Sequence, residues 1–538
     1  MRGTGGGSGA TEAHPRSAAG PGGPWLMTAV LSVATFMEIL DVSIANVALA
    51  DISGNLGVSI DQGTWIITSY LVANAIIIPI SGYLSRVIGR RRYFLISVAL
   101  FSTASLVCAL STSLGMLIAA RVFQGMGGGG LAPVEQAMIA DSFPEEKRGQ
   151  AFGAFGMVVV VAPIIGPTIG GYITDTISWH WIFFINVPIG VLAFLATLAV
   201  VREPRVLVEE TRRLRAGRLR VDWLGFLLMA IGLAGLLVTL DRGQVEDWLA
   251  SDLIRVTALM AVLGLGGMIV WELNHPDPIV PVHLLGNRNF AITVLIMLLL
   301  GFLVFGTIQL VPQMLQEIFD YTAYDAGLAL TYGGVIAIVT MPIAGQLAGR
   351  VDSRLLLFPA FAVQAVAFWH FSRFNVESTF ADAAWGRFLI SVGLPFLFIT
   401  VSTVAYVGLK PGENDKASAM LNFFRNLGGA FGISFVQTLL IRREQLHQSR
   451  MTETLNELNP VFRQDLAAQT ALFGGDRQMA LATIYHEVQR QAAMLSYVEI
   501  FHLLTWMVIA VLPLILILRP GGKKSQGRSE AEGTAATA

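Results

Sequence analysis

Two carboxylates and a carboxamide interrupt the first long apolar run of the chain. Glu38 and Asp41 stand three residues apart, so they share one face of a helix, and Asn46 follows them. The run from Trp25 to Leu49 is long enough to cross a bilayer. A charged carboxylate near the centre of a membrane helix costs about 2.5–3.5 kcal/mol, so it needs a partner, a water-filled cavity or a proton. This pattern predicts a protonatable site on a transport path, with a purely structural carboxylate as the alternative.

An arginine in a later span offers Asp41 a partner at a matching depth. At 1.5 Å per residue, Asp41 lies roughly 10–12 Å below the outer end of its helix, and Arg121 lies roughly 12 Å below the same surface. The sequence therefore predicts an ion pair that forms when Asp41 is ionised and weakens when Asp41 takes up a proton. A permanent structural salt bridge is the alternative.

The composition indicates a polytopic membrane protein. Of the 538 residues, 54% are hydrophobic and 14% are charged, and the mean hydropathy is +0.63. The apolar residues gather in blocks of membrane-spanning length rather than in an amphipathic pattern. Cys108, the only cysteine, lies inside such a block, which excludes a disulfide framework or a cysteine metal site. We therefore expect no metal centre.

Polar breaks divide the chain into fourteen predicted spans, so we expect an all-α fold of two six-helix bundles with two inserted central helices. The predicted parts are a disordered cytoplasmic tail (1–24), a first bundle (25–201), a basic cytoplasmic loop (202–221), the inserted pair (222–273), a second bundle (290–518) that includes an outer loop (441–497), and a cytoplasmic tail (519–538). Lysines and arginines gather in the loops on one side. By the positive-inside rule, both termini are cytoplasmic.

The outer loop 441–497 is far longer than an ordinary connection, and loops of that length are usually functional or disordered. Its stretches 451–466 and 479–495 predict two amphipathic helices packed as a hairpin. The apolar residues that this hairpin would bury are Leu455, Leu458, Leu466, Met479, Ile484, Val488 and Met494. We expect the hairpin to meet another protein.

An internal repeat relates the two bundles. The segments GYLSRVIGRRR (82–92) and GQLAGRVDSR (345–354) both open with Gly-x-Leu and turn basic. The segments DSFPEEKRGQA (141–151) and GLKPGENDKASA (408–419) echo each other two spans later. Spans one to six therefore match spans nine to fourteen. Parallel six-helix repeats, with the substrate site between the halves, are how a major facilitator transporter is built.

The fifth span, GMVVVVAPIIGPTIGG (156–171), combines small residues with prolines. Gly166 and Gly170 stand four residues apart, which permits close contact with another helix. Pro163 and Pro167 remove two backbone donors and bend the helix. Packing alone explains either feature, but both on one helix predict a tight contact between spans that move or seal.

From Trp25 to Pro520 the chain resembles the fourteen-span drug:proton antiporters of the major facilitator superfamily, of the EmrB type. The stretches that carry the resemblance are LDVSIANVALA, QGTWIITSYLVANAIIIPISGYL, RVFQG, APIIGPTIGGYI, WHWIFFINVPIG, WELNHPDPIV, LLGNRNF and LNFFRNLGGAFG. The fifth-span stretch matches the family's antiporter motif, whose residues here are Pro163, Gly166, Pro167, Gly170 and Gly171.

The resemblance implies export of hydrophobic or amphipathic compounds across the bacterial inner membrane, with inward protons as the coupling ion and no cofactor. It implies that Asp41 titrates and that Arg121 tunes it, whereas Glu38 joins this site on physical grounds alone. The cytoplasmic gate loop would comprise Gly82, Arg86, Gly89 and Arg90. The family's gate loop usually has an aspartate where this chain has Ser85.

The resemblance also implies partners. A periplasmic adaptor protein and an outer-membrane channel would work with the pump, beside small hydrophobic substrates and the lipid bilayer, and we expect no nucleic acid. Candidate residues of the substrate cavity are Asn46, Asn74, Gln124, Glu135, Gln309, Gln364 and Asn422, each of which could instead join neighbouring helices.

Three other readings compete with proton-coupled export. A uniporter or symporter for a nutrient would share the fold, but the proline and glycine residues of the fifth span argue against it. A membrane-embedded enzyme would need a catalytic motif, and neither His-Glu-x-x-His nor Gly-x-Ser-x-Gly is present. A receptor or scaffold would need neither the repeat nor the paired intramembrane charges.

Overall fold

The computed structural model describes residues 23–203, 208, 209, 211, 212, 222–275, 282–348, 350–407, 409, 413–453, 455, 456 and 458–518. The two expected tails lie outside the described residues apart from residues 23 and 24, and so does most of the basic loop 202–221.

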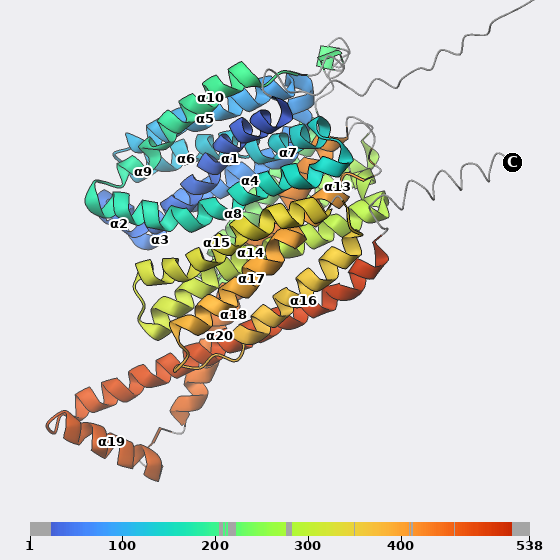
Figure 1. Ribbon diagram of the computed structural model, residues 1–538. Helices are drawn as coiled ribbons and strands as arrows, with labels where there is room; N and C mark the ends of the chain where they lie inside the picture. The colour runs from blue at the N-terminus through green and yellow to red at the C-terminus, as the bar shows by residue number, and fades with distance from the viewer. Residues whose placement is uncertain are drawn as a thin grey trace, which may run out of the picture.

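The described residues fold into helices, which Figure 1 colours along the chain. In order, they are α1 (Gly23–Val47), α2 (Leu49–Leu56), α3 (Ile60–Gly63), α4 (Trp65–Ile88), α5 (Arg90–Ala109), α6 (Leu114–Gly128), α7 (Leu131–Ser142), α8 (Glu145–Thr176), α9 (His180–Phe184), α10 (Asn186–Val200), α12 (Trp223–Arg242), α13 (Asp252–Asn274), α14 (Arg288–Phe319), α15 (Ala323–Ala348), α16 (Ser353–Phe371), α17 (Phe380–Val404), α18 (Asn414–Glu453), α19 (Pro460–Leu472) and α20 (Arg477–Ile517), with short 3-10 helices at Trp248–Ala250 and Val282–Gly286.

Within the described residues, 12 helical segments are long and apolar enough to cross a membrane. The other two predicted spans are α6 with α7, which a glycine-rich stretch divides, and the first part of α18. The division follows from the run Gly127–Gly130, since each glycine weakens a helix interior by about 1 kcal/mol relative to alanine. With these two segments, the structure accounts for the fourteen predicted spans and confirms the all-α polytopic fold.

The helices form two bundles, which lie in the upper and lower parts of Figure 1. The first comprises α1 to α10, and the second comprises α14 to α18 and α20. We call the end of the bundles that carries Gly23 and Leu518 the terminal end, and the opposite end, from which α18 and α20 extend toward α19, the hairpin end (Figure 1).

The repeat in the sequence corresponds to two matching contacts between the bundles. A Cβ atom on Gly82 of α4 would lie 2.8 Å from the carbonyl oxygen of Asp415 at the start of α18. A Cβ atom on Gly345 of α15 would lie 2.7 Å from the carbonyl oxygen of Gly149 at the start of α8. Each glycine comes from one repeated segment, and each contacts the other repeated segment of the opposite bundle. The halves are therefore related as the sequence predicted.

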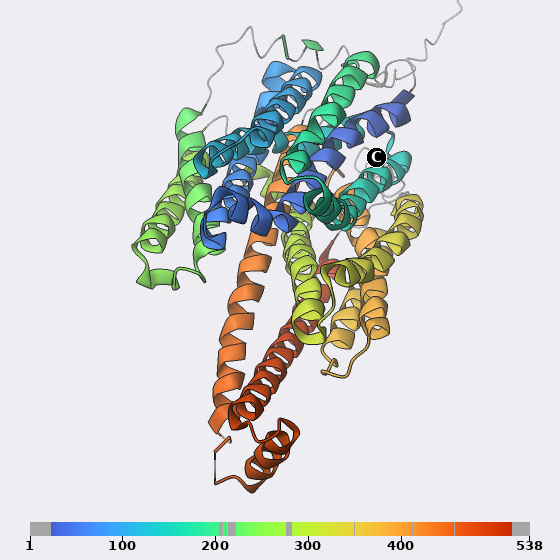
Figure 2. The ribbon, with the colours of Figure 1, turned by 90° about the vertical axis from the view of Figure 1, so that its left-hand side faces the viewer.

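The inserted helices α12 and α13 pack against each other, and α12 also contacts α4 and α18. Figure 2 shows this pair at the margin of the molecule, beside the two bundles. Two polar contacts anchor α12 to the first bundle, because Thr68 donates to Asp241 and Arg242 donates to the hydroxyl of Thr64 at 2.5 Å. The pair is thus a peripheral addition rather than a divider between the halves.

At the hairpin end, α18 and α20 run far beyond the bundles as one long antiparallel pair, with α19 at the tip (Figures 1 and 2). This differs from the predicted small hairpin, because both spanning helices continue without a break into the outer segment. Leu466, Ala480 and Ile484 form a small core at the tip. Leu458 and Met479, predicted to be buried, are 90% and 53% exposed, so the prediction is wrong for these two.

We predict that Gly428→Ala destabilises the second bundle. A Cβ atom there would lie 1.9 Å from the carbonyl oxygen of Leu298 on α14, and overpacking of this kind costs about 1–3 kcal/mol. The thermal midpoint of the detergent-solubilised protein, followed by size-exclusion chromatography, should fall. Gly266→Ala in α13 is the control, since nothing lies within 4 Å of its Cβ position. Equal midpoints for the two variants would contradict the packing argument.

Candidate functional site

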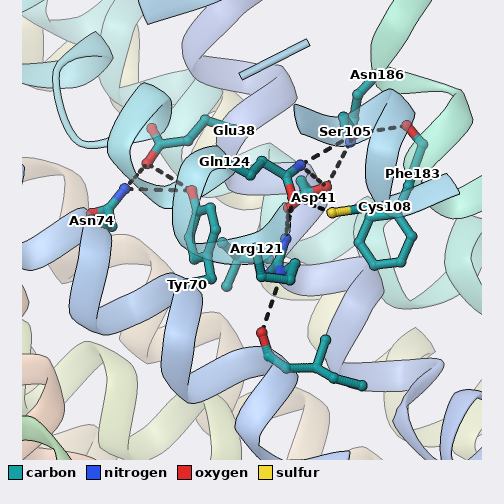
Figure 3. A network of polar contacts seen from close by, with 12 residues as sticks. Glu38, Asp41, Tyr70, Asn74, Ser105, Cys108, Arg121, Gln124, Phe183 and Asn186 are labelled. Atoms are coloured by element: carbon teal, nitrogen blue, oxygen red, sulfur yellow. Dashed lines mark hydrogen bonds and ion pairs between the residues drawn. The ribbon is translucent and has the colours of Figure 1, made fainter. Parts of the chain in front are cut away.

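The structure brings Asp41 and Arg121 together inside the first bundle (Figure 3). The Arg121 Nη1 atom donates to Asp41 Oδ2 at 2.5 Å. The other carboxylate oxygen, Oδ1, accepts from Gln124 Nε2 at 2.9 Å and from Asn186 Nδ2 at 2.6 Å. Both members of the pair are buried. Three N–H donors therefore surround the carboxylate.

Contacts from three further groups hold the guanidinium of Arg121 in place. Its Nε atom donates to the carbonyl oxygen of Ile66 at 3.2 Å, and its Nη1 atom also reaches Gln124 Oε1 at 2.8 Å. The group lies 4.2 Å from the ring centroid of Tyr70, within range of a cation–π interaction. Its Nη2 atom is buried without a hydrogen-bond partner among the described residues. Arg121 lies on α6, and the hydroxyl of Ser113, the residue that precedes this helix, caps its first turn.

Glu38 lies one helical turn from Asp41 and makes its own set of contacts (Figure 3). Its Oε1 atom accepts from Asn74 Nδ2 at 3.0 Å and from the Tyr70 hydroxyl at 3.4 Å. Arg425 on α18, in the second bundle, is close enough to act on its charge. The Nε and Nη1 atoms of Arg425 are buried and have no hydrogen-bond partner in the part of the chain that the structure describes. An acidic residue of one half thus lies within electrostatic range of a basic residue of the other.

Glu135 on α7 makes its hydrogen bonds with α1. Its side chain is fully buried. The hydroxyls of Ser32 and Thr35 on α1 each donate to one of its carboxylate oxygens, both at 2.5 Å. Glu135 is therefore enclosed within the first bundle.

A cluster of charges at the terminal end joins the two halves. The guanidinium of Arg90 pairs with Asp141 of the first bundle and, at 2.6 Å, with Asp415 of the second. The hydroxyl of Ser85 lies 3.4 Å from the other oxygen of Asp415. Gly89 has a φ of 96°, which suits glycine at the turn between α4 and α5. The segment from Gly82 to Arg90 is thus held against α18. Asp415 of α18 supplies the carboxylate that Ser85 and Arg90 contact.

Further hydrogen bonds from the first turns of α18 strengthen this closure. Asn414 donates to Asp141 Oδ1 at 2.5 Å, and Ser418 donates to the carbonyl oxygen of Pro133 at 2.8 Å. Asn422, a cavity candidate, donates to Gln136 Oε1 at 2.7 Å. Residues 414–422 therefore tie the halves together at the terminal end.

The antiporter-motif glycines of α8 contact α1 rather than the second bundle. A Cβ atom on Gly166 would lie 2.4 Å from the hydroxyl oxygen of Ser43, and one on Gly170 would lie 2.9 Å from a methyl carbon of Ile44. Gly171 has nothing within 4 Å of its Cβ position. The tight contact predicted for the fifth span is therefore made with α1, within one turn of Asp41.

The remaining candidates are scattered. Gln124 and Asn74 belong to the Asp41 and Glu38 sites. Asn46 is exposed and donates to the carbonyl oxygen of Val42 on its own helix, and Gln309 is exposed on α14. Gln364 is buried on α16, and its Oε1 atom has no partner among the described residues.

Sequence reasoning missed several residues of the site. Asn186 and Tyr70 bind the central acids, and Asp415 and Arg425 reach across from the second half. Polar residues within apolar runs were the available signal for Asn186 and Arg425. Only helix packing shows which partners they take: that of α10 against α1 and α5 for Asn186, and that of α18 against the first bundle for Arg425. Among the described residues, no group of three or more His, Cys, Asp or Glu is placed to hold a metal ion.

Comparison with known proteins agrees with this architecture. A family described as the Major Facilitator Superfamily matches residues 31–433. The multidrug export protein EmrB of Escherichia coli K12 is 40% identical over 496 residues, which is 92% of this chain and 95% of that protein. The probable multidrug resistance protein EmrY of the same organism is 37% identical over 497 residues, 92% of this chain and 95% of that one.

A solved structure of the proton:xylose symporter XylE, bound to 6-bromo-6-deoxy-D-glucose, superposes with a TM-score of 0.55 over 87% of this chain and 94% of that chain, at 14% identity. At that identity the likeness concerns the fold alone. The identity with EmrB and the family match carry the assignment. The chain belongs to the major facilitator superfamily of membrane transporters, within its EmrB group, and is a transporter rather than an enzyme.

Proposed function

We propose that this transporter exports hydrophobic or amphipathic drugs and toxic compounds across the bacterial inner membrane in exchange for protons. The observation that carries the proposal is the buried pair of Asp41 and Arg121. Within the bundle, the negative charge of Asp41 can be neutralised only by a proton. The name of EmrB, a multidrug export protein, supports the cargo class. In this proposal the terminal end and both termini are cytoplasmic.

The pair gives the transporter a two-state element. When Asp41 is ionised, its carboxylate accepts from Arg121, Gln124 and Asn186, which come from two helices other than its own. A proton from the outside converts the carboxylate into a neutral acid, which loses the attraction to the guanidinium and cannot accept all of these bonds equally well. The helices that supply them are then free to rearrange, and the proton leaves to the inside after the rearrangement.

The charge cluster around Arg90 provides the matching latch. It closes the terminal end in this structure, and its partners lie in different halves. Opening toward the cytoplasm requires that Arg90 separate from Asp415 and that residues 414–422 leave α7. Substrate would enter between the halves in that state and leave at the hairpin end after the latch re-forms.

A uniporter or symporter remains the alternative, since the proton:xylose symporter shares the fold. The fold alone does not give the direction of coupling. Export against a substrate gradient by vesicles under an imposed proton gradient distinguishes the two.

The segment beyond the hairpin end fits a docking role. Leu458, Val461 and Leu472 are 90%, 72% and 77% exposed around α19, which is unusual for a tip that carries its own small core. We propose that this surface binds a periplasmic adaptor protein, which in turn connects to an outer-membrane channel. A pump that only released drugs at the membrane surface would need a short turn here.

Asp41→Asn should abolish proton-driven transport without loss of expression, because the amide keeps the shape of the side chain but cannot bind a proton. The measurement is uptake of a fluorescent dye by everted membrane vesicles after a proton gradient is imposed. Asp51→Asn, at an exposed position of α2, is the matched control and should behave as wild type. Dye transport at the wild-type rate by the Asp41 variant would rule out its coupling role.

Arg121→Lys should impair coupling and shift the pH optimum of transport. Lysine keeps the charge but loses the fork that contacts Asp41, Gln124 and Ile66 together, so the ion pair with Asp41 is weaker. The pH profile of vesicle transport measures the shift. Arg255→Lys, at an exposed position of α13, is the control. An unchanged profile would mean that the two residues do not interact.

Replacement of both Val461 and Leu472 by Asp should separate transport from resistance. Both side chains are exposed, so the change leaves the fold intact. Vesicle transport should match wild type, while cells that express the variant should lose drug resistance because the adaptor no longer binds. Gln464→Asp, exposed on the same helix, is the control. Resistance equal to wild type would refute docking at this surface, and loss of vesicle transport would assign α19 to the transport cycle itself.

A further inference from the structure

Three positions of the fourth span lie beside α1 at seven-residue intervals: Arg121 and Gly128 on α6, and Glu135 on α7. A turn at residues 129 and 130 divides the two helices, so the contacts of each residue, rather than one helical period, place it beside α1. Arg121 meets Asp41. A Cβ atom on Gly128 would lie 3.2 Å from Cγ of Glu38. Three polar layers therefore follow one another along the seam between α1 and the fourth span.

The third layer is the contact of Glu135 with Ser32 and Thr35. Thr35 lies one helical turn from Glu38 on α1, about 4.5 Å along the axis at 1.5 Å per residue. The layers run from Asp41, near the hairpin end of α1, through Glu38 to Glu135, toward the terminal end. The seam thus leads from the Asp41 site toward the terminal end of the first bundle, where α1 starts.

The donors around the three acids change in kind along the seam. Asp41 accepts only from N–H groups, which cannot accept a bond in return. Glu38 accepts from one N–H group and from the hydroxyl of Tyr70. Glu135 contacts two hydroxyls. A hydroxyl can donate to a carboxylate, or rotate and accept from a carboxylic acid, so the Glu135 site satisfies both protonation states.

The charged residues near Glu135 allow its own charge to change. The charged residue that acts on Glu135 is Glu38 of α1. From α5, the hydroxyl of Tyr93 lies beside Gly130 at the start of α7. Near the far end of α7, Arg90 of α5 is paired with Asp141 and with Asp415 of α18. Arg425, also on α18, acts on Glu38. The structure shows no ion pair between Glu135 and any described residue. A buried carboxylate without a cation is costly, which favours a bound proton in at least one state.

We propose that Glu135 is a second proton-binding site, which passes the proton between Glu38 and the terminal end. On binding, the proton forms the O–H bond of a neutral carboxyl group, which donates to the hydroxyl oxygen of Ser32 or Thr35. On release, the hydroxyl rotates and donates to the carboxylate again, so one proton enters and one leaves. This site deepens the proposed function and rests on it, and it assigns the inner part of the proton path to the first bundle alone.

Infrared spectroscopy of the full chain in liposomes tests the proposal without any cargo. The difference spectrum between acidic and alkaline buffer reports buried carboxyl groups through the C=O stretch of their protonated form. We expect Glu135→Gln to remove one component of this band, Asp41→Asn to keep that component, and Glu135→Asp to restore it. Glu146→Gln, at an exposed position of α8, should leave the band unchanged.

Identical difference spectra for wild type and Glu135→Gln would overturn the proposal, because Glu135 would then keep one protonation state as a structural group. If Glu135→Gln does not fold, the double variant Ser32→Ala/Thr35→Ala keeps the acid and removes its hydroxyls. It should shift the pH at which the component disappears, and an unchanged pH would contradict the relay. Absence of dye transport by wild-type vesicles would count against the proposed export alone, since the infrared result is obtained without a transported compound.

Discussion

The cost of charge in hydrocarbon governs the first bundle. Asp41 and Arg121 are both buried, and a bundle that held either one alone would leave a charge without compensation. Their position therefore requires α1 and α6 to meet at one depth, with α10 close enough for Asn186 to complete the set. The close approach of α8 to α1 at Ser43 holds the same helix from its other side. In this half, the same helix contacts thus pack the bundle and supply the partners of the buried acid.

The two halves contribute different charged residues. The first half holds three acids along one seam, each with a different set of donors. The second half contributes Arg425, which acts on Glu38, and Asp415, which closes the latch on Arg90. Both come from α18, and so do the hydrogen bonds of residues 414–422 to α7. A single helix of the second half therefore supplies both the cation that acts on Glu38 and the contacts that join the halves at the terminal end.

The sequence was sufficient where geometry follows directly from helical rise. The depths of Asp41 and Arg121 could be matched because both lie in unbroken helical turns close to a known helix end. The repeat predicted two matching halves, and the paired glycine contacts of α4 and α15 agree with it. The partners of Arg90 and Glu135 could not be predicted, since they depend on which helices pack together rather than on spacing within one. At the tip, the apolar pattern predicted burial of Leu458, but the chain between α18 and α19 turns this side chain outward.

The length of α18 has a mechanical consequence. This one unbroken helix begins with Asn414 and Asp415 at the latch and ends at Glu453 beside the tip. Its 40 residues make a rod about 60 Å long at 1.5 Å per residue. If such a rod tilts by about 5° at the latch, its far end moves by about 5 Å, and α19 moves with it. A tilt of α18 on release of Arg90 would therefore displace α19 at the opposite end of the molecule, through one continuous helix.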